Sequence, residues 1–155
     1  MTKIEEYKRA AKLDDDLDAW LNLADAYYDE GNFEDAVVAY GRATELDPYS
    51  SEAWNNLGLA LSLTGEDEEA IEAYKQALKR NPGDSVVMFN IATSNEDIGR
   101  TEEAIRWYKK AIEYSPGYTD AMSSIAQIYE DRGKTRKAIK WLNRAIKINP
   151  DDAQL

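Results

Sequence analysis

Apolar residues recur at helical spacing along this chain, separated by short polar stretches that contain glycine, proline, serine or aspartate. Near the N-terminus, Ile4, Tyr7, Ala10 and Leu13 form a stripe and predict a helix over residues 3–13. The rest of the chain predicts helices in pairs. First helices are expected over 17–30, 51–64, 85–98 and 119–132, and second helices over 34–47, 68–81, 102–115 and 136–149. We therefore expect an all-α protein.

The pattern returns with a fixed period of 34 residues. A constant period in this range indicates a repeat architecture, in which each unit buries its apolar face against its neighbours. In each unit a glycine closes the first helix and a proline ends the second. The recurring residues are Gly31, Gly65, Gly99 and Gly133; Pro48, Pro82, Pro116 and Pro150; Ala36, Ala70, Ala104 and Ala138; and Ala43, Ala77, Ala111 and Ala145.

The order of residues within one unit resembles that of the tetratricopeptide repeat (TPR) family, whose pattern is W-x2-L-G-x2-Y, then A-x3-F, then P. The matching residues of the second unit are Trp54, Leu57, Gly58, Ala70, Tyr74, Ala77 and Pro82. The departures are mild: tyrosine or leucine takes the place of the phenylalanine, and Met88 and Met122 replace the leading tryptophan in the last two units.

The resemblance implies a right-handed superhelical solenoid of antiparallel helix pairs. It divides a single TPR domain over residues 1–155 into a half repeat, 1–16, and repeats 17–50, 51–84, 85–118 and 119–152. The half repeat runs one residue short of the period, and the slip falls where Asp15 or Asp16 replaces the expected proline. We expect Asp16, Ser50 or Ser51, Asp84 or Ser85, and Thr119 to cap the first helices.

The last second helix carries Ile139, Leu142 and Ile146 and is followed only by DDAQL. A terminal repeat leaves an apolar face that a polar capping helix normally covers. We therefore expect a segment of a longer array. The rival interpretation is a chain that covers this face by self-association.

Composition excludes several kinds of chemistry. The chain has no histidine and no cysteine, which removes disulfides, zinc sites built from these residues, thiol nucleophiles and imidazole triads. No calcium loop of the D-x-D-x-D-G type is present. We predict no enzyme activity, no cofactor and no metal.

The net charge of −11 argues against nucleic acid and anionic membranes as partners. There is no apolar run of the roughly 18 residues that a membrane helix needs, and the N-terminus does not read as a signal peptide. These features favour a cytoplasmic protein.

The resemblance also implies that the first helices line a concave groove. One groove position holds Asn22, Asn56, Asn90 and then Ser124. Because an amide side chain offers both donors and an acceptor, it can pair with an extended peptide backbone. The row resembles the asparagine ladder of peptide-binding TPR arrays. The alternative is that these amides bond within the array.

The first helices hold ten acidic residues and one basic residue, with Asp25 among the acidic ones. A concave surface of one sign attracts ligands of the opposite sign, so the groove should prefer a neutral or basic segment. Arrays that clamp a carboxylate tail place cations on these helices, and that clamp is absent here. Plain solvation of the helices is the alternative explanation.

An apolar patch beside the asparagines comprises Leu59, Leu63, Val86 and Phe89, unless some of these turn inward. Trp107 and Trp141 lie among basic residues and form either an outer surface or inter-repeat packing. Asn95 falls at an interior position, as a buried hydrogen-bonded amide or as a loosened helix end.

We predict a protein-interaction module that binds an extended, neutral or basic peptide segment. Two alternatives stay open: a homo-oligomeric scaffold assembled through repeat ends or outer helices, and the targeting array of a larger enzyme. The predicted peptide-binding residues are Asn22, Asn56, Asn90, Asp25, Leu59, Leu63, Phe89 and Ser124.

Overall fold

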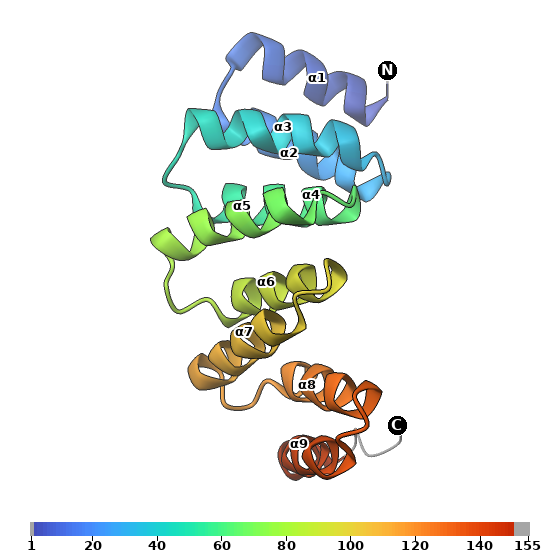
Figure 1. Cartoon of the computed structure of the whole chain (residues 1–155). Helices are drawn as coiled ribbons and strands as arrows, with labels where there is room; N and C mark the ends of the chain where they lie inside the picture. The colour runs from blue at the N-terminus through green and yellow to red at the C-terminus, as the bar shows by residue number, and fades with distance from the viewer. Residues whose placement is uncertain (1, 151–155) are drawn as a thin grey trace. The chain divides into compact units, whose positions relative to one another are not determined.

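The computed structural model describes residues 2–150, which contain α-helices joined by short turns and no strand (Figure 1). The chain divides into two compact units, Met1–Pro82 and Gly83–Leu155. The first unit contains α1 (Lys3–Asp14), α2 (Leu17–Asp29), α3 (Phe33–Leu46), α4 (Ser51–Leu63) and α5 (Asp67–Arg80). The second unit contains α6 (Ser85–Asp97), α7 (Thr101–Tyr114), α8 (Thr119–Asp131) and α9 (Thr135–Ile148).

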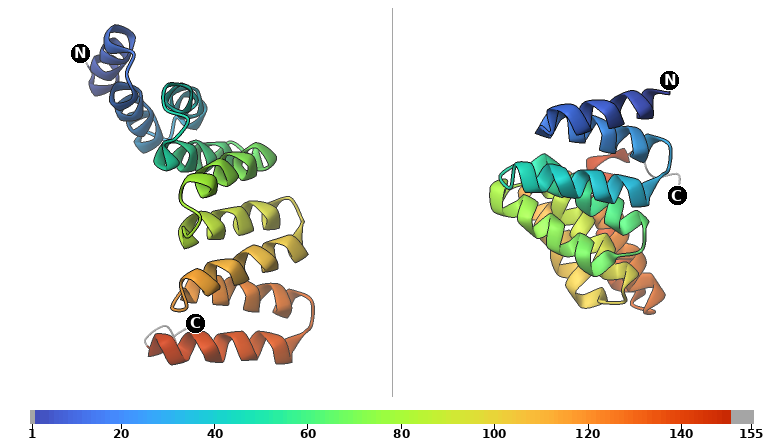
Figure 2. Two further views of the ribbon diagram at one scale, coloured as in Figure 1. Left: turned by 90° about the vertical axis from the view of Figure 1, so that its left-hand side faces the viewer. Right: turned by 90° about the horizontal axis from the view of Figure 1, so that it is seen from above.

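The all-α prediction is confirmed, and α2, α4, α6 and α8 begin at the first residue of the predicted repeats. Each pairs with the helix that follows it, and the two members run antiparallel (Figure 2). The second helices begin and end one residue earlier than predicted. The reason is a tight turn, which needs only three residues between the members of a pair.

The repeated glycine makes this turn. Gly31 has φ of +77°, a left-handed conformation that glycine adopts without steric cost. Its N–H bonds to the carbonyl of Tyr28, and the N–H of Asn32 bonds to that of Tyr27, at 3.0 and 2.9 Å. These two bonds satisfy carbonyls that the helix end leaves open. Gly65, Gly99 and Gly133 close α4, α6 and α8 in the same way.

Three of the predicted N-caps are confirmed. The side chains of Asp16, Ser50 and Asp84 accept hydrogen bonds from the backbone at the starts of α2, α4 and α6. The prediction for Thr119 is wrong: it is the first helical residue of α8, and Tyr118 stands at the N-cap without a side-chain bond. The ring of Tyr118 stacks on Phe89 instead, so this position serves packing.

The stripe predicted on the first helix is partly wrong. Ile4 is buried and Tyr7 is half-buried, but Leu13 is 72% exposed. Ala11 is fully buried in its place. A spacing of three residues drifts around an α-helix with 3.6 residues per turn, whereas Ile4 and Ala11 are two full turns apart.

Each unit has its own apolar core. All eight repeated alanines are buried, which lets paired helices approach closely. In the first unit, Leu23, Tyr27 and Tyr40 share a core cluster with Ala36. In the second unit the corresponding core contains Tyr108, Met122 and Ile125. Tyrosine and methionine side chains therefore fill much of the space between the helices.

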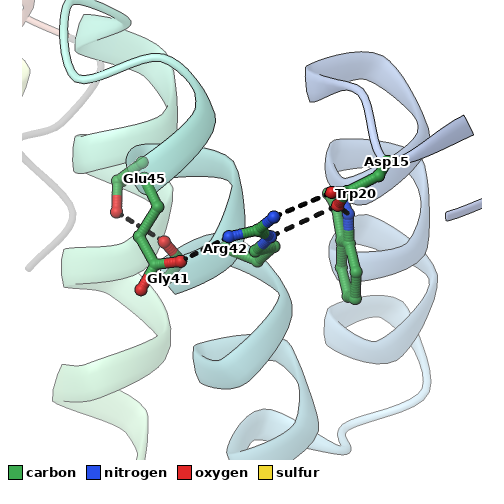
Figure 3. A network of polar contacts seen from close by, with 6 residues as sticks. Asp15, Trp20, Gly41, Arg42 and Glu45 are labelled. Carbon is green, nitrogen blue, oxygen red and sulfur yellow. Dashed lines mark hydrogen bonds and ion pairs between the residues drawn. The ribbon is translucent and has the colours of Figure 1, made fainter. Parts of the chain in front are cut away.

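The one-residue slip after the half repeat has a structural explanation. Asp15 ends α1 with φ of +42° and accepts a bond at 2.8 Å from the Trp20 indole on α2. Its carboxylate also receives two bonds from Arg42 on α3, at 2.8 and 3.3 Å, and Arg42 in turn pairs with Glu45 (Figure 3). Asp15 therefore ties three helices together at the position where later repeats have proline.

Asn95 is a buried, hydrogen-bonded amide. Its Nδ2 donates to the carbonyl of Ile91 at 2.8 Å, and α6 continues past it to Asp97. The loosened-end interpretation is therefore wrong. None of the helices in residues 2–150 has the length and apolar character that a membrane crossing requires. The segment DDAQL, on which the expectation about a longer array depended, lies outside the described residues.

Candidate functional site

In the first unit, five predicted site residues lie on α2 and α4. Asn56, Leu59 and Leu63 follow one another at i, i+3 and i+7 and so share one face of α4. Leu63 is 51% exposed, while Asn56 and Leu59 are half-buried. Asn22 and Asp25 are exposed one turn apart on α2. The α4 face therefore combines an amide with an apolar side chain in contact with solvent.

Asp25 is held by the neighbouring helix. The hydroxyl of Tyr40 on α3 donates to its Oδ1 at 2.6 Å. Burial, and then this bond to a carboxylate, raise the pKa of Tyr40 well above its usual range. The phenol therefore remains a neutral donor, and it presents the carboxylate of Asp25 in a fixed position on the α2 face.

Asn56 has a polar neighbour on its own helix. Asn55 Nδ2 donates to Asn56 Oδ1 at 3.3 Å, a long bond between adjacent side chains. A bond of this length and local character is weak. It occupies the amide oxygen of Asn56 and orients its NH₂ group, which is the part that would donate to a peptide carbonyl.

In the second unit, Phe89 and Ser124 meet around Tyr108. The Phe89 ring lies 5.2 Å from that of Tyr108 and 5.2 Å from that of Tyr118, on which it stacks with an interplanar angle of 25°. The hydroxyl of Ser124 is close to that of Tyr108. Phe89 is thus half-buried and packs against the core of this unit. Asn90, on the same helix, is also half-buried.

In this unit too, a carboxylate accepts a hydrogen bond from a buried tyrosine hydroxyl. Tyr108 donates to Glu96 at 2.9 Å and lies 3.3 Å from the hydroxyl of Thr93. Burial raises the pKa of Tyr108 to about 12. The first and third repeats therefore share a device in which a core tyrosine of the second helix holds a carboxylate on the first helix.

Trp107 and Trp141 pack against the core of the second unit and are half-buried. Lys110 lies over the Trp107 ring at 4.3 Å, and Arg144 lies 5.4 Å from the Trp141 ring. The packing interpretation of these tryptophans is therefore correct, and their outer edges carry cations.

The sequence reasoning missed a cavity beside Trp54. It has a volume of about 470 Å³ and lies between α4 and α5. Trp54, Leu57 and Leu61 supply its apolar side, and three carboxylates of α5 line it, those of Glu68, Glu69 and Glu72. We call it the Trp54 cavity. None of these residues is among the predicted site residues.

A comparable cavity of about 240 Å³ beside Trp20 shows why the Trp54 cavity is larger. Lys8 and Lys12 of α1 line the smaller one. In the register that matches Ile4 with Val37, the corresponding residues of α3 are Gly41 and Glu45, and neither lines the Trp54 cavity. Gly41 was the available signal, because a glycine inside a helix leaves space where a side chain would lie.

In residues 2–150, no group of three or more carboxylates is arranged to hold a metal ion.

Comparisons with known proteins agree on the repeat family. Family models described as tetratricopeptide repeat match residues 4–51, 21–85 and 97–155. The solved structure titled "Crystal structure of MamA" is 29% identical, covers 98% of this chain and 90% of its own, and has a TM-score of 0.90. A structure titled "MamA 41-end from Desulfovibrio magneticus RS-1" is 14% identical, covers 97% and 85%, and has a TM-score of 0.86. No curated protein sequence matches the chain.

Proposed function

Because the chain belongs to the tetratricopeptide repeat family, we propose that this protein-interaction module binds an extended peptide segment of a partner on the α2 and α4 face. The observation that carries the proposal is the arrangement on α4. An amide, a half-buried leucine and an exposed leucine lie on one face, at Asn56, Leu59 and Leu63. No catalytic centre is part of this proposal.

The chemistry of this face suits a peptide backbone. The amides of Asn56 and Asn22 pair with backbone carbonyls and N–H groups, whatever the peptide sequence is. Leu59 and Leu63 provide apolar contact for one or two side chains of the peptide. An extended peptide gives affinity through its main chain and specificity through such pockets.

The charge of the face selects the ligand. Asp25 is exposed and fixed by Tyr40, and the α2 helix carries no basic residue. A peptide with a lysine or arginine opposite Asp25 gains a charge-assisted hydrogen bond, whereas an acidic peptide is repelled. We therefore propose a neutral or basic segment as the ligand.

In the second unit, Phe89, Asn90 and Ser124 belong to the same proposal. Asn90 and Ser124 offer polar groups beside an aromatic side chain that Tyr118 holds in place. Since Phe89 is anchored in the core, it provides a rigid rim rather than a side chain that must be ordered on binding.

The experiment is a selection from a random library of displayed twelve-residue peptides, followed by affinity measurement on the purified chain. The Asn22→Ala, Asn56→Ala double variant should bind a selected peptide more weakly. The loss of binding free energy should be about 1–3 kcal/mol for each peptide group left unpaired. The control is Lys75→Ala, Lys79→Ala, two exposed residues of α5. Equal affinity of the peptides for the asparagine variant and the control would refute this site.

A further inference from the structure

The outer face of α9 is uncovered in the described part of the chain. Ile139, Leu142 and Ile146 are 50, 38 and 39% exposed. The residues one period earlier on α7, Ile105, Tyr108 and Ile112, are only 3, 2 and 3% exposed. The difference arises because α7 packs against two helices, α6 and α8. Within residues 2–150, the extensive contacts of α9 are with α8, its partner in the pair.

The same helix carries a single sign of charge. Residues 135–148 contain five cations and no carboxylate: Arg136, Lys137, Lys140, Arg144 and Lys147. A surface groove along α9 combines Ile139 and Trp141 with Arg136, Lys140, Arg144 and Lys147. A partner for this face must therefore offer apolar contact together with carboxylates.

The Trp54 cavity offers that chemistry on the same chain. Its apolar side is Trp54, Leu57 and Leu61, and its carboxylates are those of Glu68, Glu69 and Glu72, all three exposed. Lysine and arginine have apolar stems and charged heads, so they can lie along Trp54 while their heads meet the glutamates.

The first repeat contains an intramolecular example of such a contact. The cavity beside Trp20 is lined by Lys8 and Lys12 of α1, and the ammonium of Lys8 lies 5.2 Å from the Tyr27 ring. Of these two lysines, Lys12 matches Lys147 of α9 in the repeat register. A basic second helix facing a tryptophan-lined cavity is thus a contact that this chain already makes.

We propose that α9 of one copy docks its basic side chains onto the Trp54 cavity of a second copy. The Trp54 cavity includes residues of α4, but none of the proposed peptide-binding residues lines it or the α9 groove. The contact therefore uses other residues than those proposed to bind peptide. The two surfaces are different, so the interface is heterologous: copies can add head to tail or close into a ring. Because the contact pairs opposite charges at the surface, salt should weaken it.

The test measures the mass of the intact chain by sedimentation velocity over a range of concentrations, at low and at high salt. We expect a concentration-dependent increase in mass, with an association constant roughly tenfold lower at high salt. Glu69→Lys, Glu72→Lys should abolish association, and so should Lys140→Glu, Arg144→Glu. Mixing the two variants should restore it, since each then meets a surface of opposite charge.

The control is Asp29→Lys, Glu30→Lys, which makes the same change in net charge at two exposed residues away from the cavity. It should associate like the unmodified chain. Far-UV circular dichroism checks that each variant is folded, and rescue on mixing cannot come from misfolded proteins. A chain that stays monomeric at every concentration would overturn the proposal. So would variants that associate as strongly as the unmodified chain, which would indicate another interface.

Discussion

The hydroxyl of Tyr40 on α3 donates a hydrogen bond to the carboxylate of Asp25 on α2, at 2.6 Å. Tyr40 is buried, so its ring anchors the two helices while its hydroxyl reaches the helix surface. We expect Tyr40→Phe to lower the free energy of unfolding by about 1 kcal/mol, because one hydrogen bond is lost while the packing is kept. Urea denaturation measures this change.

The pH dependence of Tyr40→Phe gives an independent check. The pKa of Tyr40 is raised in the folded state, so its stabilising contribution is present below the unfolded pKa of about 10 and is lost at higher pH. The difference in stability between the two proteins should therefore be constant near neutral pH and shrink above about pH 10. Tyr114→Phe, at an exposed phenol, should change stability by less than about 0.5 kcal/mol.

Gly58 is required by the close approach of Tyr74. A Cβ placed on Gly58 would lie 2.5 Å from the Tyr74 ring, and Tyr74 is buried. We expect Gly58→Ala to destabilise the chain by about 1–3 kcal/mol through overpacking. Gly41→Ala is the matched control, since a Cβ there meets nothing within 4 Å, and it should stabilise helix α3 by about 0.5–1 kcal/mol. Thermal denaturation measures the stability of both variants. A Gly58→Ala variant more stable than the Gly41→Ala variant would contradict this explanation.

The Asp15 network should make the first unit sensitive to acid. Hydrogen bonds from Arg42, and then from Trp20, lower the pKa of Asp15. Its contribution is therefore present above the unfolded pKa of about 3.9 and is lost as pH falls through the lower folded value. Asp15→Asn tolerates the left-handed backbone and should reduce stability at neutral pH. The difference from the unmodified chain should vanish in strong acid, as measured by urea denaturation at a series of pH values.

The helices and the repeats were predictable because their signals are local and recur. The turn glycines, the capping residues Asp16 and Asp84, and the paired alanines all act through neighbours within one repeat. The prediction that Thr119 caps α8 was wrong because the residue at the N-cap is Tyr118. The ring of Tyr118 packs on Phe89, which is some 30 residues away in sequence.

The surfaces were less predictable than the helices. The exposure of Leu63 and the inward packing of Phe89 depend on which side chains of other helices reach them. The Trp54 cavity lies between α4 and α5, and its lining combines side chains of both helices that the repeat pattern does not single out together. Repeat position therefore indicates which face a residue occupies, while exposure requires the packed structure.

Asn95 tests whether a buried polar group serves stability or function. It is almost fully buried, and its amide donates to the carbonyl of Ile91, one turn back on the same helix. The second repeat places Leu61 at this position, where it is also buried. Replacing a buried amide with an apolar residue of similar size is close to neutral or stabilising, because no charged group loses its hydrogen-bond partner.

We therefore expect Asn95→Leu to raise the free energy of unfolding by about 1 kcal/mol, through added apolar burial. Asn95→Ala is the companion variant, and it should lower stability by about 1–3 kcal/mol because it leaves a space in the core. Urea denaturation of both variants separates the two contributions. A loss of stability in Asn95→Leu as large as that in Asn95→Ala would show that the amide itself, rather than the volume of the side chain, stabilises the third repeat.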